Sequence, residues 1–169
     1  MLELFTFGAL LITMCVFYKD ETTVFHASRL QLNIFYGTIN TLFLLVGGYC
    51  MIMAVNLAKV NSLQGARLYT IGAIISGLLF LVVKGFEYSE KICSGLVMGV
   101  NSFWNFYWML TLFHVIHLIA GLVILFFLLS GLRKDNQENL IDDFTAGVAF
   151  WHMCDLIWLL LFPVLYLVF

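Results

Sequence analysis

Charged residues are scarce in this chain of 169 residues, because Lys, Arg, Asp and Glu make up only 11% of it. A soluble domain carries about 25% charged residues. Hydrophobic residues reach 63% and the mean hydropathy is +1.01, so a soluble domain is excluded. The formal net charge is −2 and no basic patch is present, which argues against a nucleic-acid partner. We therefore predict an all-α integral membrane protein, with residues 1–169 forming a single transmembrane domain.

Cysteine and proline are also rare, with four and one residues respectively. Cys15, Cys50, Cys93 and Cys154 form no CxxC pair, which argues against a zinc site or a disulfide framework and predicts buried free thiols. The one proline, Pro163, lies inside the last apolar segment, where it should kink a helix or mark its last turns. The first apolar segment has no basic region before it and no obvious small-residue cleavage site. This favours a retained first span over a signal peptide.

Five apolar segments meet or approach the length of about 20 residues that a helix needs to cross a membrane. We predict transmembrane helices at residues 1–18, 34–58, 68–92, 103–132 and 144–169, which together form a five-transmembrane-helix bundle. The connections are predicted to be a loop or interfacial turn at 19–33, a short loop at 59–67 and a highly charged loop at 133–143. Such short loops make successive helices antiparallel neighbours.

Two patterns bear on how these helices pack. Ala73 and Gly77 are small residues four apart, a spacing that lets another helix approach closely. Chance recurrence in an apolar run containing Gly and Ala explains this pattern equally well. The fourth segment opens with an aromatic cluster suited to the membrane interface. Its members are Phe103, Trp104, Phe106, Tyr107 and Trp108.

The third segment carries two opposite charges on one helix face, Lys84 and Glu87. Each charge at a membrane centre costs about 2.5–3.5 kcal/mol, and an opposite charge beside it offsets part of that cost. Both residues lie toward the end of the segment, so the Lys84 side chain is able to extend to the interface. The pair is interpreted as a structural ion pair near the interface. The alternative is a carboxylate in a low-dielectric pocket that carries or gates a proton.

The fourth and fifth segments carry histidines within apolar sequence. His114 and His117 are three residues apart and share a helix face, as do His152 and Asp155. Hydrocarbon offers a histidine no partner, so these faces should look at protein, water, a metal or a cofactor. We expect the three polar faces to meet inside the bundle as a network that joins the helices. Two alternatives stay open: metal or haem iron held by the imidazoles, and a transport or proton pathway.

Three motifs stand in order on successive segments: Lys84-x-x-Glu87-Tyr88, Phe113-His114-x-x-His117-x-x-x-Gly121 and Trp151-His152-x-x-Asp155-x-x-Trp158. With them, the chain resembles subunit III of the haem–copper oxidases, the cytochrome c and quinol oxidases. The resemblance covers the chain from about residue 33 to its end. Longer members of that family have seven helices, so this chain is similar to the short five-helix form. Residues 101–107 look most like the NorE-like homologues associated with bacterial nitric oxide reductases.

The resemblance implies a non-catalytic accessory subunit of a respiratory complex, not an enzyme by itself. It implies partners in the haem-bearing catalytic subunit I, other membrane subunits and phospholipids. No cofactor is expected to bind directly except phospholipid, because haem and copper or iron would belong to the partner subunit. The implied role is to stabilise the catalytic subunit and to support its proton uptake and lipid environment. The implied location is the bacterial inner membrane, with the mitochondrial inner membrane as the alternative.

The resemblance also implies roles for single residues, and none of them is catalytic, cofactor-binding or metal-ligating. Two departures from the family pattern stand out: Lys84 replaces the Gln of many members, and Phe150 replaces the Tyr that often precedes the Trp-His pair.

The alternative function is an independent haem- or metal-binding redox protein, or a small proton channel or transporter centred on Glu87. The implied buried polar network, related to protons or lipid, is Lys84, Glu87, His114, His117, His152 and Asp155, and the implied packing residues are Trp151, Trp158 and Gly121.

Overall fold

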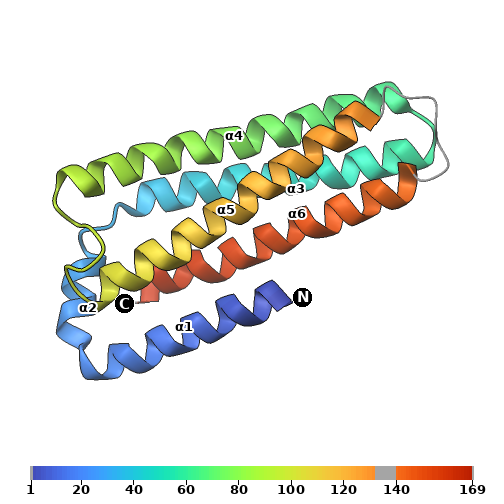
Figure 1. Ribbon diagram of the computed structural model, residues 1–169. Helices are drawn as coiled ribbons and strands as arrows, with labels where there is room; N and C mark the ends of the chain where they lie inside the picture. The colour runs from blue at the N-terminus through green and yellow to red at the C-terminus, as the bar shows by residue number, and fades with distance from the viewer. Residues whose placement is uncertain (1, 132–139, 169) are drawn as a thin grey trace.

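The computed structural model describes residues 2–131 and 140–168, and within these ranges the chain is helical with short turns and no strand. Figure 1 shows four long helices, α3 to α6, lying along one another, with α1 beside them and the short α2 at one end. The prediction of an all-α protein is confirmed. The helices are α1 Leu2–Asp20, α2 Thr22–Arg29, α3 Ile34–Lys59, α4 Leu63–Cys93, α5 Ser102–Gly131 and α6 Leu140–Pro163, followed by the π-helical turn η1 Val164–Val168.

Four helical stretches are long and apolar enough to cross a membrane: Ile34–Lys59, Leu63–Cys93, Ser102–Gly131 and Ile141–Val168. The protein is therefore an integral membrane protein. Helix α1 has 19 residues, carries Glu3 near its start and Lys19 near its end, and packs beside α5 and α6. The predicted count of five spans is approximate. Within residues 2–131 and 140–168, four helical stretches are long and apolar enough to cross a membrane, and α1 lies alongside them as a shorter helix.

The predicted loops are shorter in the structure than in the sequence interpretation. Helix α2 occupies part of the predicted loop 19–33, because Phe25 and Ser28 lie on one helix face that is buried against the bundle. Helix α4 begins at Leu63, so the predicted loop 59–67 reduces to a tight turn in which Asn61 adopts φ 56°. Asn tolerates this left-handed region better than most residues. The predicted loop 133–143 falls mostly on residues 132–139, outside the described residues.

Helix α2 is tied to the C-terminal end of the bundle by polar contacts. The Arg29 guanidinium donates from Nε to the Tyr166 carbonyl at 3.1 Å and from Nη2 to the Leu167 carbonyl at 3.4 Å. The Lys91 amino group donates to the Gln31 carbonyl at 2.6 Å. Arg29 therefore ties α2 to η1, and Lys91 of α4 ties the segment after α2 to the end of α4.

Pro163 ends α6, as the sequence predicted. Proline has no N–H to continue the helix and its ring clashes with the preceding turn. The chain continues as the π-helical turn η1, which places Leu165 and Tyr166 in the core. The predicted kink or last turn is thus confirmed, and it sets the direction of Tyr166.

Trp151 fills a space that glycines on two other helices leave open, and it also lies close to Gly121 of α5. A Cβ added to Gly47 of α3 would lie 3.1 Å from the Trp151 ring, and one added to Gly77 of α4 would lie 2.8 Å from it. A Cβ added to Gly121 of α5 would lie 3.5 Å from the same ring. The predicted close approach at Gly77 is therefore real, since the missing side chain lets a large indole from α6 enter between the helices.

Two expectations about burial are wrong. The aromatic cluster that opens α5 is not an interfacial belt, because Phe103, Trp104, Tyr107 and Trp108 are buried in the bundle. These rings pack edge to face on one another, and the Trp108 indole N–H donates to the Leu96 carbonyl at 2.9 Å.

The four cysteine thiols are free, but only one of them is buried as predicted. Cys154 is buried, Cys50 is half-buried, and Cys15 and Cys93 are exposed.

Candidate functional site

The centre of the bundle holds a buried ion pair between Lys84 and Glu87, one turn apart on α4. Lys84 Nζ lies 2.8 Å from Glu87 Oε2, and the two side chains are 1% and 0% exposed. The expectation that Lys84 extends to the interface is therefore wrong. Its amino group finds its partners inside the protein, which removes the need to reach water.

Two tyrosines from other helices complete this ion pair. Tyr107 of α5 donates its hydroxyl hydrogen to Glu87 Oε1 at 2.9 Å, and Tyr166 of η1 donates to the same oxygen at 2.5 Å. Lys84 Nζ donates in turn to the Tyr166 hydroxyl oxygen at 2.9 Å. Both carboxylate oxygens of Glu87 thus accept hydrogen bonds, and α4, α5 and η1 are joined at one point.

Aromatic rings surround the Lys84 cation. Its Nζ lies 5.2 Å from the centroid of the Trp158 ring and 5.3 Å from that of Tyr88, distances at which a ring face attracts a cation. The Trp158 indole N–H donates to the Thr41 hydroxyl at 3.0 Å, which connects α6 to α3. Trp158, predicted as a packing residue, therefore also forms one wall of the charged site.

Sequence reasoning missed Tyr107 and Tyr166. Tyr107 was assigned to an interfacial cluster, and Tyr166 lies 79 residues from Glu87 in the sequence. The only local signal is the position of Tyr166 three residues after Pro163, where the helix changes its geometry. Which hydroxyl reaches Glu87 depends on how the helices pack, and spacing along the chain does not encode that.

His114 and His117 point to different neighbours although they are three residues apart. The His114 ring is buried, and its Nε2 lies 3.2 Å from the Cys154 carbonyl of α6. His117 Nε2 lies 2.9 Å from Glu3 Oε2 of α1, and its Nδ1 lies 2.7 Å from the Phe113 carbonyl. Three residues span about 300° of helix, so the two side chains diverge by about 60°. That divergence is enough for each to reach a different helix.

His152 and Asp155 form the third polar group, on α6. His152 Nδ1 lies 3.3 Å from Asp155 Oδ2, and the side chains are 35% and 9% exposed. Gly48 of α3 faces this pair, since a Cβ there would lie 2.6 Å from Asp155 Oδ2. The pair thus sits between α6 and α3 at the surface of the bundle, not at its centre.

The expectation that the three polar faces meet as one network is wrong. The Lys84–Glu87 pair occupies the core, His117 pairs with Glu3 of α1, and His152 pairs with Asp155 near the surface. Only His114 approaches the central pair, because its ring lies 5.1 Å from the Trp158 ring that also borders Lys84. The functional role assigned to these residues stays a prediction.

The geometry offers no support for the alternative functions. Each imidazole of α5 and α6 has a separate partner. Among the residues that the structure describes, no group of three or more His, Cys, Asp or Glu side chains could hold a metal ion. Glu87 is fully buried, and its two oxygens accept hydrogen bonds from Lys84, Tyr107 and Tyr166.

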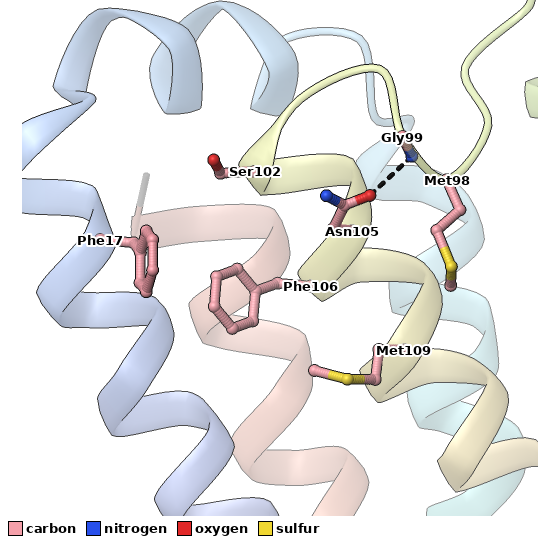
Figure 2. A pocket seen from close by; sticks show the side chains of 7 residues that line it. All are labelled: Phe17, Met98, Gly99, Ser102, Asn105, Phe106 and Met109. Atoms are coloured by element: carbon pink, nitrogen blue, oxygen red, sulfur yellow. Dashed lines mark hydrogen bonds between the residues drawn. The ribbon is translucent and has the colours of Figure 1, made fainter.

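A separate apolar pocket lies where α1 ends and α5 begins. Figure 2 shows Phe17 of α1 facing Phe106 of α5, with Met109 below them and the loop residue Met98 on the right-hand side of the view. Its volume is about 640 Å³. Ser102 and Asn105 are its polar lining, and the Asn105 side-chain oxygen accepts from the Gly99 N–H at 2.6 Å. The pocket is suited to an apolar chain with a polar group at one end.

Fold and site together define the class: a helical membrane protein built around a satisfied internal ion pair. The profile of the family described as cytochrome c oxidase subunit III matches residues 31–168. The chain therefore belongs to the cytochrome c oxidase subunit III family. The resemblance found in the three sequence motifs is confirmed at the family level.

Individual relatives agree with this assignment. The probable cytochrome c oxidase subunit 3 of Mycobacterium leprae is 27% identical over 82% of this chain and 69% of its own length. Cytochrome c oxidase subunit 3 of Thermostichus vulcanus is 26% identical over 81% of this chain and 68% of its own. The heme-copper oxidase subunit I+III of Aeropyrum pernix is 28% identical over 78% of this chain and 16% of its own. The comparisons give no support to the narrower likeness to nitric oxide reductase homologues.

Proposed function

We propose that this chain is a non-catalytic accessory subunit of a haem–copper oxidase, packed in the membrane against a haem-bearing catalytic subunit I. The observation that carries the proposal is the family match over residues 31–168, which spans α3 to α6 and every residue of the central charged site. The name of the Aeropyrum relative joins subunits I and III, which supports subunit I as the partner.

The internal chemistry fits a supporting role. The charges of Lys84 and Glu87 are satisfied within the chain, so the site holds helices in register and leaves the redox chemistry to the partner. Haem and copper or iron would accordingly be bound by the catalytic subunit. In this proposal the chain contributes stability, lipid contacts and support for proton uptake by that subunit.

Phospholipid is the ligand that we propose for the chain itself. The pocket between α1 and α5 has apolar walls for an acyl chain, and Ser102 and Asn105 supply polar groups at its edge (Figure 2). The bacterial inner membrane is the location that the resemblance to the short five-helix form supports. The mitochondrial inner membrane is the alternative.

Removal and return of the chain from the assembled oxidase tests the proposed function. The complex is stripped of this subunit in mild detergent, and oxygen consumption is followed over many turnovers. We expect the initial rate to persist and the activity to decay faster, and the added purified chain should restore the original lifetime. Decay that is identical with and without the chain would refute the supporting role.

A further inference from the structure

A groove on the outer surface of the bundle has an ionisable pair at its floor. The groove runs between α3 and α6 and has a volume of about 490 Å³. His152, Asp155 and Gly48 form its floor. The walls are apolar and consist of Leu45, Tyr49, Ile52, Leu156 and Leu159.

The pair lies near the middle of the last helical stretch that is long and apolar enough to cross a membrane. The last spanning stretch is Ile141–Val168, and residues 152–155 fall about halfway along it. Lipid tails at that depth offer no hydrogen-bond partner, so an ionisable pair there needs protein or water. The depth distinguishes this groove from polar surface sites near the helix ends.

The pair is incompletely satisfied by the chain itself. Asp155 Oδ2 is the oxygen that contacts His152 Nδ1, whereas Asp155 Oδ1 is buried and has no hydrogen-bond partner among the described residues. With the proton shared between His152 Nδ1 and Asp155 Oδ2, Oδ1 remains an acceptor. The described residues supply no donor for it, so a donor from a neighbouring subunit would satisfy it.

The shape of the groove suits a helix. Leu45, Tyr49 and Ile52 form a ridge at spacings of four and three on α3, and Leu156 and Leu159, three residues apart on α6, form the opposite wall. A ridge and a facing wall that flank a depression form a surface into which the ridge of another helix packs. Because Gly48 has no side chain, the floor between them stays low beside Asp155.

We propose that this groove seats a transmembrane helix of the catalytic subunit, and that this helix brings a hydrogen-bond donor side chain to Asp155. The inference rests on the proposed function, which supplies the partner. An acyl chain would fill the walls but leave Asp155 unpaired. A second copy of this face would bring two acceptor carboxylates together. The pocket between α1 and α5 makes no such demand, because its Asn105 oxygen is already bonded to Gly99.

Photo-crosslinking in the intact complex tests the surface. A photo-reactive benzoylphenylalanine replaces Tyr49 in the groove, or Phe86 on α4 as a matched aromatic control outside it; the two side chains are 59% and 66% exposed. We expect a product with the haem-bearing subunit, mapped to one of its transmembrane helices, from position 49 and none from position 86. A product from position 49 that contains only lipid, or only a second copy of this chain, would overturn the proposal.

The same experiment separates the two hypotheses. A product with the haem-bearing subunit from position 86 but not from 49 leaves the proposed function standing and refutes this docking surface. No product from either position, together with a chain that purifies without any haem-bearing subunit, refutes the proposed function itself.

Two substitutions test the donor. Asp155→Leu removes the acceptor, and we expect it to weaken retention of the catalytic subunit about tenfold, the size expected of one hydrogen bond to a charged group. Asp155→Asn keeps an acceptor oxygen and should retain most of the binding. A merely structural role for Asp155 predicts equal retention once both variants are shown to have wild-type melting. Wild-type retention by Asp155→Leu would contradict the proposal, and if that variant does not fold, the crosslinks decide.

Discussion

Glu87 illustrates how a charge is made tolerable inside a membrane protein. Its carboxylate would be costly alone in hydrocarbon. Lys84 supplies a counter-charge and two tyrosine hydroxyls supply hydrogen bonds, so no oxygen of the carboxylate is left without a partner. A buried pair of this kind adds little net stability over apolar residues, but removal of one member leaves an uncompensated charge. Its value lies in fixing how the helices meet.

Removal of one member of this pair should therefore be more harmful than removal of both. We predict that Glu87→Gln lowers the free energy of unfolding by about 3–5 kcal/mol, because the Lys84 cation is left buried and unpaired. The double variant Lys84→Gln, Glu87→Gln should recover most of that loss, since two amides can bond to each other. Denaturant unfolding in detergent micelles measures the four free energies of this cycle.

Glu90→Gln is the matched control for that cycle. Glu90 lies on the same helix and pairs with Lys91 at 3.4 Å, but its side chain is 47% exposed. Its loss should change stability by no more than about 1 kcal/mol, because the exposed Glu90 makes only a long contact and the buried Lys91 keeps its hydrogen bond to the Gln31 carbonyl. A double variant whose loss equals the sum of the two single losses would show that Lys84 and Glu87 are not coupled.

At the residue scale, spacing was enough to predict the pairs within one helix. Lys84 with Glu87 and His152 with Asp155 are both one turn apart, and both are in contact. Spacing did not predict partners on other helices. The His117 contact with Glu3 spans 114 residues, and it depends on where α1 lies against α5.

Among the helices, the contact of α6 with its neighbours depends on small residues. Trp151 enters where Gly47, Gly77 and Gly121 present no side chain, so four helices approach around one indole. The alternation of one large ring with glycines on its neighbours is how membrane helices gain close packing where the hydrophobic effect between them is weak. Gly47, Gly77 and Trp151 therefore act as one packing unit, because a side chain at either glycine would crowd the indole.

Gly77→Ala should disrupt this unit. The added methyl carbon would lie 2.8 Å from both Trp151 and Leu122, so a side chain or a helix has to move. We predict a loss of about 1–3 kcal/mol in the free energy of unfolding, the range for overpacked cores.

Gly85→Ala on the same helix is the control, because nothing lies within 4 Å of a Cβ there. Alanine favours a helix over glycine by up to about 1 kcal/mol, so this variant should be neutral or slightly stabilised. Thermal unfolding of the two variants in the same detergent compares them directly. Equal melting temperatures would contradict the packing role of Gly77.

The Pro163 turn controls the position of Tyr166. An alanine at 163 would allow α6 to continue as a regular helix, which should rotate Tyr166 away from Glu87. We predict that Tyr166→Phe costs about 1–3 kcal/mol in the wild-type background, the value for a lost hydrogen bond to a charged group. The same change should cost much less in the Pro163→Ala background. Additive losses in the double variant would show that the proline does not position the tyrosine.

Helix existence could be predicted from the sequence, whereas helix ends were less certain. Runs of apolar residues specify a spanning segment whatever its neighbours are. The start of α4 at Leu63 was missed because residues 63–67 include Gln64 and Arg67, which are polar but compatible with a helix. Helix α2 was missed because its eight residues are too few and too polar to show as a span.

For the whole molecule, composition and three ordered motifs were sufficient to predict a membrane-embedded subunit III. The chain belongs to that family, and its four long helices surround a charged centre that is closed to the outside. The prediction that all polar faces form a single network was wrong. Helix packing separates these residues into one group in the core, one that faces α1 and one that faces α3. That separation leaves the pair of His152 and Asp155 on the α3-facing side of α6, where a partner would meet it.

The most direct test of the central claim is co-purification. The tagged chain is isolated from its native membrane in a gentle detergent, and the eluate is examined by visible spectroscopy and mass spectrometry. An accessory subunit predicts a large haem-bearing subunit in the eluate, with the haem spectrum lost from the chain when the two are separated. A chain that purifies alone, as a stable protein with its own stoichiometric haem or metal, would contradict the account.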